Sequence, residues 1–254
     1  MPSRQLRRLC LVGVPVLVAG IASTGASAQQ GDVAITSTAQ TGAIEGRVEV
    51  SRTLTARRAR FRIYAEPGVG AQPPRTDPKD QDERRNIVVY VERVSSVGGV
   101  VLAGGERATL RQHDERFVPH VLPVVRGTTV DFPNDDPLFH NVFSLSRAKA
   151  FDLGRYPRGN SRAVTFDRAG IVQVFCHIHS DMSAVALVLE NPYYAVPDAE
   201  GRYSIPNLPP GEYTLVAWHE RIRPITHRLR IEPGQRARVD FTIPLPAADA
   251  AQQR

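Results

Sequence analysis

Short apolar runs separated by glycine, proline and charged residues recur along most of the chain, and helical periodicity is almost absent after residue 41. Apolar residues at every second position are typical of strands that bury one face, whereas an amphipathic helix repeats them every three to four positions. The pattern therefore predicts an all-β sandwich or barrel. The expected strands are 44–50, 60–64, 87–92, 100–102, 108–112, 122–125, 129–132, 141–144, 161–166, 170–175, 184–189, 202–205, 213–219, 225–231 and 236–243.

The first 28 residues have the pattern of a secretory signal instead of a strand. Three arginines precede an apolar run over 9–22, and Ala26-Ser27-Ala28 supplies the small residues of a cleavage site. The run is shorter than the roughly 20 residues of a membrane span, although an uncleaved anchor is the alternative. We expect cleavage after Ala28, no stable membrane span, and a periplasmic or secreted protein.

Removal of this segment changes the charge and the cysteine content. The formal net charge of the 254-residue chain falls from +6 to +3, because three arginines are lost. So small a positive charge argues against a nucleic-acid partner. Of the two cysteines only Cys176 remains, and one thiol cannot form an internal disulfide. We expect the Cys176 thiol either to be shielded from oxidation or to have a functional role.

Residues 174–182 read VFCHIHSDM and contain a cluster of soft metal ligands. Cys176, His179 and Met182 recur at intervals of three, so a tight turn can bring their side chains to one point. His177 follows the cysteine directly and should point away while the chain stays extended. A thiolate, two imidazoles and a weak axial thioether form the ligand set of blue-copper sites. His140 is the candidate for the second imidazole, because a turn-rich segment delivers it to the end of a neighbouring strand.

Two stretches around these ligands resemble the cupredoxins of the plastocyanin, pseudoazurin and amicyanin group. They read RFVPHVLPVVRGTTVDFPNDDPLFHNV and FDRAGIVQVFCHIHSDMSAVALV, within residues 108–190. The resemblance implies a Greek-key sandwich, one type 1 copper held by His140, Cys176, His179 and Met182, and one-electron transfer. It also implies that His179 lies near the surface as the electron port. The chain departs from the family at Ile178, where proline is common, and at His177, where a small hydroxyl residue is common.

Other interpretations of the cluster are weaker. Cys176 can be a buried structural thiol, since free cysteine is often buried. Structural zinc prefers four Cys and His ligands and does not normally take Met. A cysteine nucleophile with a histidine base is conceivable, but it leaves the methionine without a role. A trinuclear oxidase centre needs more histidines than the chain's seven.

A second resemblance covers residues 198–244. The stretch DAEGRYSIPNLPPGEYTLVAWHE is similar to the carboxypeptidase regulatory-like, or transthyretin-like (prealbumin-like), β-sandwich, and GAIEGRVEV and RNIVVYVERV resemble its opening strands. The peptidase zinc motif is missing from the sequence, so that site is not implied. We expect one sandwich built from both flanks, with the cupredoxin inserted between them. The expected segments are a signal at 1–28, a leader at 29–42, sandwich strands with a long loop at 43–107, the cupredoxin at 108–190, sandwich strands at 191–245 and a disordered tail at 246–254.

These expectations together describe an exported copper protein that passes single electrons between redox partners and is not an enzyme. The alternative is a copper-handling or scaffold protein whose cupredoxin domain is not catalytic. Arg155 and Arg158 flank a loop rich in glycine and proline, and Arg162 follows it. A solvated basic loop is one interpretation of these arginines, and docking to an acidic redox partner is the other.

Overall fold

The computed structural model describes residues 40–51, 83–94 and 107–244, and these form strands with one short 3-10 helix, η2 (Glu83–Asn86). The protein is all-β, as the alternation of apolar residues predicts. The expected signal, the tail and the expected strands 60–64 and 100–102 lie outside the described residues. Within the described ranges there is no helix with the length and apolarity that a membrane crossing requires.

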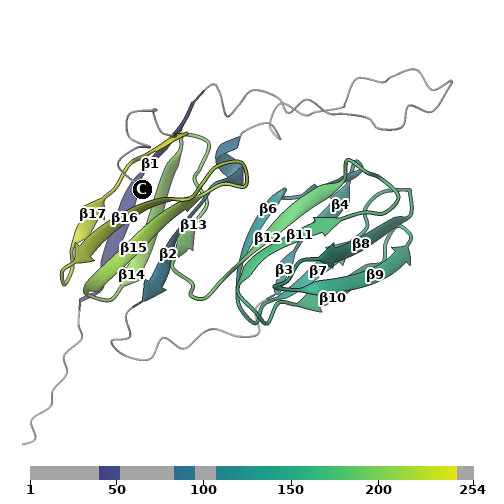
Figure 1. The fold of residues 1–254 in the computed structure, drawn as a ribbon, viewed down its shortest axis with the longest axis horizontal. Coiled ribbons are helices and arrows are strands. Elements are labelled where there is room, and N and C mark those ends of the chain that lie inside the picture. Colours follow the sequence, from purple (N-terminus) through teal and green to yellow (C-terminus); the bar gives the residue numbers. More distant parts are fainter. Residues whose placement is uncertain (1–39, 52–82, 95–106, 245–254) are drawn as a thin grey trace, which may run out of the picture. The chain divides into compact units, whose positions relative to one another are not determined.

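One β-sandwich combines strands from the two ends of the chain (Figure 1). One sheet has the order β14-β1-β17, with β18 also paired to β1, and the other has the order β13-β2-β15-β16. Its strands are β1 (Gly42–Val50), β2 (Val88–Val94), β13 (Tyr194–Ala195), β14 (Arg202–Leu208), β15 (Gly211–Trp218), β16 (Ile225–Ile231), β17 (Arg236–Arg238) and β18 (Phe241–Ile243).

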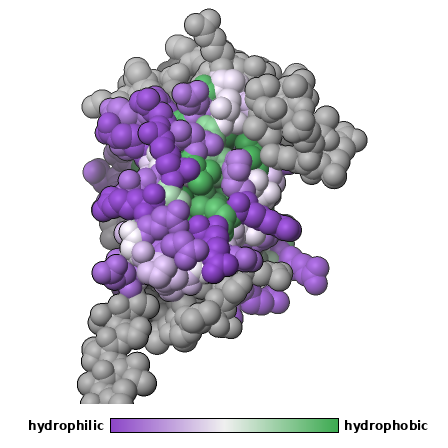
Figure 2. Space-filling view, turned by 90° about the vertical axis from the view of Figure 1, so that its left-hand side faces the viewer, coloured by the Kyte–Doolittle hydropathy of each residue, from purple (hydrophilic) through white to green (hydrophobic). Residues whose placement is uncertain are grey.

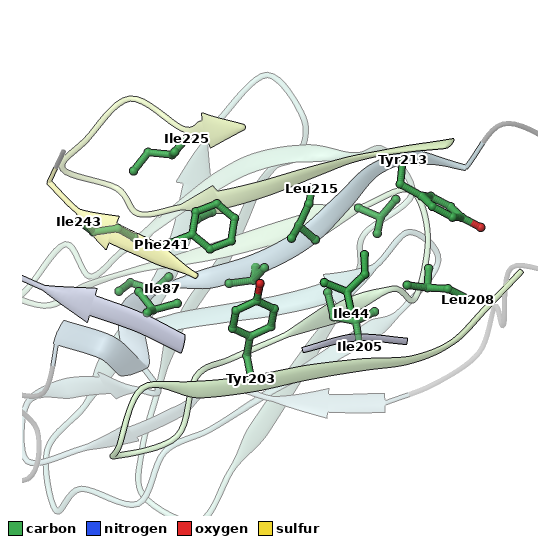
Figure 3. Packing of buried hydrophobic residues seen from close by; sticks show 14 of the residues in the cluster. Ile44, Ile87, Tyr203, Ile205, Leu208, Tyr213, Leu215, Ile225, Phe241 and Ile243 are labelled. Atoms are coloured by element: carbon green, nitrogen blue, oxygen red, sulfur yellow. The ribbon is translucent and has the colours of Figure 1, made fainter. Parts of the chain in front are cut away.

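The core of this sandwich follows from alternation along its strands. Tyr213, Leu215 and Ala217 share one face of β15 and are buried, as their spacing predicts. In Figure 3 the side chains of Tyr213 and Leu215 point from one sheet toward Ile44 and Ile205 of the other. On the face shown in Figure 2, hydrophilic residues surround a smaller hydrophobic area.

Strand β1 shows how the two flanks combine. It pairs antiparallel with β14, where Ile44 lies opposite Ile205, and parallel with β17 and β18. Strand β2 likewise pairs with β15, with Val91 opposite Leu215. The chain therefore leaves this sandwich after β2 and returns to it at β13, and the intervening strands form a second sandwich.

The second sandwich has a three-stranded sheet, β10-β7-β3, a five-stranded sheet, β6-β12-β11-β8-β9, and a hairpin of β4 and β5. The pairs β3–β7 and β6–β12 are parallel. The strands are β3 (Arg107–Thr109), β4 (Arg111–His113), β5 (Arg116–Val118), β6 (Val121–Val125), β7 (Thr129–Pro133), β8 (His140–Leu145), β9 (Ala150–Tyr156), β10 (Ser161–Thr165), β11 (Gly170–Phe175) and β12 (Ser183–Leu189).

Strand β9 is a difference from the sequence analysis, which predicts no strand at 150–156. Gly154 at a φ of 64° lies within it, and Arg155 belongs to this strand instead of a loop. Its pairing with β8 places Arg155 opposite Asn141 and Tyr156 opposite His140. The turn between β9 and β10 therefore lies at the end of the sheet where β8 begins.

Candidate metal centre

The loop between β11 and β12 carries three of the four predicted ligands. Cys176 directly follows β11, and its N–H donates to the carbonyl of Met182 at 3.2 Å. The N–H of Met182 in turn donates to the carbonyl of His179 at 3.0 Å. These two main-chain hydrogen bonds close a compact turn, so the spacing of three residues between the ligands corresponds to a real structural unit.

The fourth predicted ligand comes from a neighbouring strand. His140 is the first residue of β8, which runs antiparallel to β11 with Phe143 opposite Phe175. The start of one strand therefore lies beside the end of the other. The His140 side chain is completely buried, and its Nε2 lies 2.7 Å from Oδ2 of Asp136. Because a carboxylate only accepts, Nε2 carries a proton, and in the neutral ring the lone pair is therefore on Nδ1.

Three donor atoms converge at this point. Nδ1 of His140 and Nδ1 of His179 are 3.0 Å apart, and Sγ of Cys176 lies 3.9 Å from the first and 3.8 Å from the second. These distances define a triangle whose corners all lie about 2.1 Å from one central point. Metal–nitrogen and metal–thiolate bonds in proteins are about 2.0 to 2.3 Å long. The three residues thus fit one metal ion without rearrangement.

Met182 and His177 occupy different surroundings. The Met182 side chain is buried in the same apolar cluster as Cys176 and Val142, and its role as an axial ligand stays a prediction. His177 is exposed and packs its ring edge-on against Phe143, with centroids 3.8 Å apart. The structure therefore separates His177 from the donor triangle, as the alternation of an extended chain suggests.

Two acidic residues that the sequence analysis did not single out surround the histidines. The Asp136 carboxylate accepts from the backbone N–H groups of Asp114 at 2.6 Å and Glu115 at 2.9 Å, in addition to His140. Burial raises the pKa of Asp136, but these hydrogen bonds outweigh it and the net pKa is lowered. A carboxylate four residues before His140 is a possible signal, but only the folded turn at 114–115 reveals its partners.

His179 is the more accessible of the two histidines. Its side chain is 21% exposed, and its Nε2 lies 3.9 Å from the Glu115 carboxylate. Burial lowers the pKa of His179, and the nearby His140 lowers it further, because two protonated imidazoles at this distance would repel each other. A neutral imidazole can offer a lone pair to a metal, so this shift favours ligation. Cys176 is a free, buried thiol at the same point.

Comparisons with solved structures give partial matches. A Cu-containing nitrite reductase (NirK) from Thermus scotoductus SA-01 is 25% identical, with a TM-score of 0.32. The match covers 37% of this chain, and this chain spans only 25% of the length of the reductase chain. A purple cupredoxin from Nitrosopumilus maritimus is 21% identical over 33% of this chain and 99% of its own, with a TM-score of 0.29. Amicyanin from Paracoccus versutus is 21% identical over 34% of this chain and 84% of its own, with a TM-score of 0.31.

A comparison with curated proteins finds no match. The family model of the carboxypeptidase regulatory-like domain matches residues 182–244. This match begins at Met182 and so includes β12, which the structure places in the second sandwich. The comparisons name the two families that the sequence motifs resemble: residues 182–244 match the carboxypeptidase regulatory-like domain, and the chain is also similar to cupredoxins.

Proposed function

We propose that the chain is a type 1 copper protein that carries single electrons between redox partners. The observation that carries this proposal is the convergence of Sγ of Cys176 with Nδ1 of His140 and His179, at distances that fit one metal ion. One thiolate and two imidazoles with a nearby methionine are the donor set that copper prefers in electron-transfer sites.

The donor set calls for a cation, and the number and kind of its members favour copper over zinc. Two nitrogen atoms 3.0 Å apart that face each other repel unless a proton or a cation lies between their lone pairs. Zinc would satisfy that need, but its structural sites take four Cys or His ligands, and the described clusters of potential ligands offer three at this point. A buried methionine beside Cys176 fits a softer ion.

The protein's own residues would keep the site rigid. Copper supplies the exchange of one electron between two valences. Asp136 holds the buried His140 ring, and the two main-chain hydrogen bonds of the 176–182 turn hold the other ligands. Because both His140 and the 176–182 turn are already in place without metal, little rearrangement of the ligands should accompany a change in the charge of the copper. Rigid positioning of this kind favours fast electron transfer.

His179 provides the route to a partner in this proposal. Its ring is partly exposed, and the chain neighbours of the two histidines, Phe139 before His140 and Ile178 before His179, are apolar side chains that reach the surface at 57% and 40% exposure. Arg158 lies in the β9–β10 turn at the same end, and Arg155 and Arg162 lie on the two strands beside it; these cations suit an acidic redox protein. Export, as the N-terminal pattern predicts, would place this exchange in the periplasm or outside the cell.

Copper reconstitution of the metal-free protein tests this function. We expect one copper per chain and an intense visible absorption band from thiolate-to-copper charge transfer. The Cys176→Ser variant should lose that band, because the thiolate is its source. A protein that binds copper without the band, or with the same spectrum in Cys176→Ser, would contradict the proposal.

A further inference from the structure

The hairpin of β4 and β5 has an unusual turn. Asp114 and Glu115 connect the two strands, with His113 opposite Arg116, and both turn residues have positive φ angles of 51° and 54°. A two-residue hairpin of this kind needs left-handed backbone at both positions, which is why glycine and asparagine are common there. Glutamate lacks that preference, so an interaction must hold this turn in place.

The interaction is with a residue beside the metal centre. The turn directs two consecutive backbone N–H groups at the Asp136 carboxylate, at 2.6 and 2.9 Å, although Asp136 lies 21 to 22 positions further along the chain. Consecutive N–H groups of a turn form a concave site for an anion. The N–H of Asp135 also donates to the carbonyl of Gln112 on β4 at 2.9 Å, which joins the same two segments a second time.

The carboxylate passes this constraint on to a candidate ligand. Asp136 is 4% exposed, and Oδ2 accepts from both Glu115 N–H and His140 Nε2–H. Its two oxygens therefore receive three hydrogen bonds, and they leave the His140 ring one tautomer and one orientation. In that orientation Nδ1 is directed at Nδ1 of His179 and Sγ of Cys176.

We propose that the main chain of the Asp114–Glu115 turn is a positioning element of the metal centre, which acts through Asp136 to orient His140. This inference rests on the proposed function, since it assigns the turn a role toward the metal. It assigns no necessary role to the two turn side chains: the Asp114 and Glu115 side chains are exposed, and the N–H groups carry the contact.

The first test uses the metal-free wild-type protein, so it stands apart from copper binding. We expect the amide hydrogens of Asp114 and Glu115 to exchange slowly for residues of an exposed turn, and the His140 Nε2 proton to give a resolved NMR signal. Fast exchange of both amides, or absence of the Nε2 proton, would overturn the inference whatever the protein binds. Failure of copper binding with these signals present would instead contradict the proposed function.

The second test compares Cu(I) dissociation constants, measured by competition with a chromophoric chelator. Asp136→Asn should weaken binding about 10- to 100-fold, the usual effect of losing a partner that orients a ligand. Asp114→Gly keeps the N–H and the positive φ but removes the side chain, so its affinity should stay within about 3-fold of wild type. Asp181→Asn removes an exposed carboxylate from the ligand loop and controls for charge alone.

Two outcomes of this comparison would contradict the inference. Asp114→Gly would bind as weakly as Asp136→Asn if the turn's side chain, and not its main chain, did the positioning. Asp136→Asn would bind as tightly as wild type, with its His140 Nε2 proton retained, if the carboxylate were dispensable. Thermal unfolding of each metal-free variant shows whether it folds. If Asp136→Asn does not fold, the hydrogen-exchange measurement on the wild-type protein decides the inference.

Discussion

Nδ1 of His140 and Nδ1 of His179 lie 3.0 Å apart although the residues are separated by 39 positions in the chain. One begins β8 and the other belongs to the turn that follows β11, and these strands are antiparallel neighbours. The sheet therefore brings a strand start and a strand end together. A rigid framework of this kind limits the rearrangement of ligands when a bound metal changes its charge, which favours electron transfer.

The two histidines of the loop should respond differently to substitution. His179→Ala removes a donor atom and should weaken copper binding by more than about 100-fold, beyond the loss of an outer partner. His177→Ala removes a ring that packs on Phe143 outside the donor triangle and should change affinity by less than about 3-fold. Chelator competition measures both, and equal losses in the two variants would mean that the ligand assignment is wrong.

Gly46 tests the sandwich that the two ends of the chain build together. A Cβ at this position of β1 would collide with the backbone carbonyl oxygen of Val239, between β17 and β18. Gly46→Ala should therefore lower the free energy of unfolding by at least about 2 kcal/mol. Urea unfolding followed by fluorescence of Trp218, the chain's single tryptophan, measures it within the same sandwich.

Gly211→Ala is the matched control for that measurement. A Cβ at Gly211 would meet only the Tyr213 ring, at 3.7 Å or more, which is ordinary contact. Its effect should lie within about 1 kcal/mol of zero, with the sign set by the stiffer unfolded chain. Similar losses in both variants would show that the close approach of β1 to Val239 does not limit stability.

Glu83 should make the stability of the same sandwich depend on pH. Burial raises its pKa, but hydrogen bonds from His219 at 3.1 Å and Asn86 at 3.0 Å outweigh burial and lower the pKa from 4.5 to about 2. Because the folded pKa lies below the unfolded value, the stabilisation is present above pH 4.5 and is lost as the pH falls toward 2. Because Glu83 is partly exposed, solvent screening keeps its full size below about 3 kcal/mol.

Glu83→Gln tests this dependence. The variant should be less stable than wild type at pH 7. The difference should shrink as the pH falls below about 4.5, because Glu83 of the unfolded wild-type chain then becomes protonated while the folded carboxylate stays charged until the pH approaches 2. Trp218 fluorescence in urea at several pH values measures it. A difference that is constant between pH 7 and pH 3 would assign the effect to packing instead of charge.

The candidate ligands could be proposed from the sequence because they lie within one turn or at the end of a strand. Cys176, His179 and Met182 fall within one turn, whose spacing is visible in the chain. His140 could be placed because a strand pattern ends near it. Asp136 was visible only as part of a turn-rich segment, because its role depends on two N–H groups from a hairpin 21 to 22 positions earlier.

The fold shows the same limit. Apolar alternation predicts all-β structure and most strands, such as β16, whose bounds agree with the expected 225–231. It misses β9, because AFDLGRY contains a glycine and two charged residues, Asp152 and Arg155, and its pairing with β8 decides its structure. It also places one strand at 236–243, where the structure has β17 and β18 separated by Val239 and Asp240.

A reductive titration of the copper-reconstituted protein, followed by optical and EPR spectra, tests the central claim most directly. The account predicts that one electron per copper bleaches the thiolate-to-copper band and the Cu(II) EPR signal, and that reoxidation restores both without loss of metal. Absence of the band, or release of copper to a chelator on reduction, would contradict an electron carrier, and the release would point to copper handling instead.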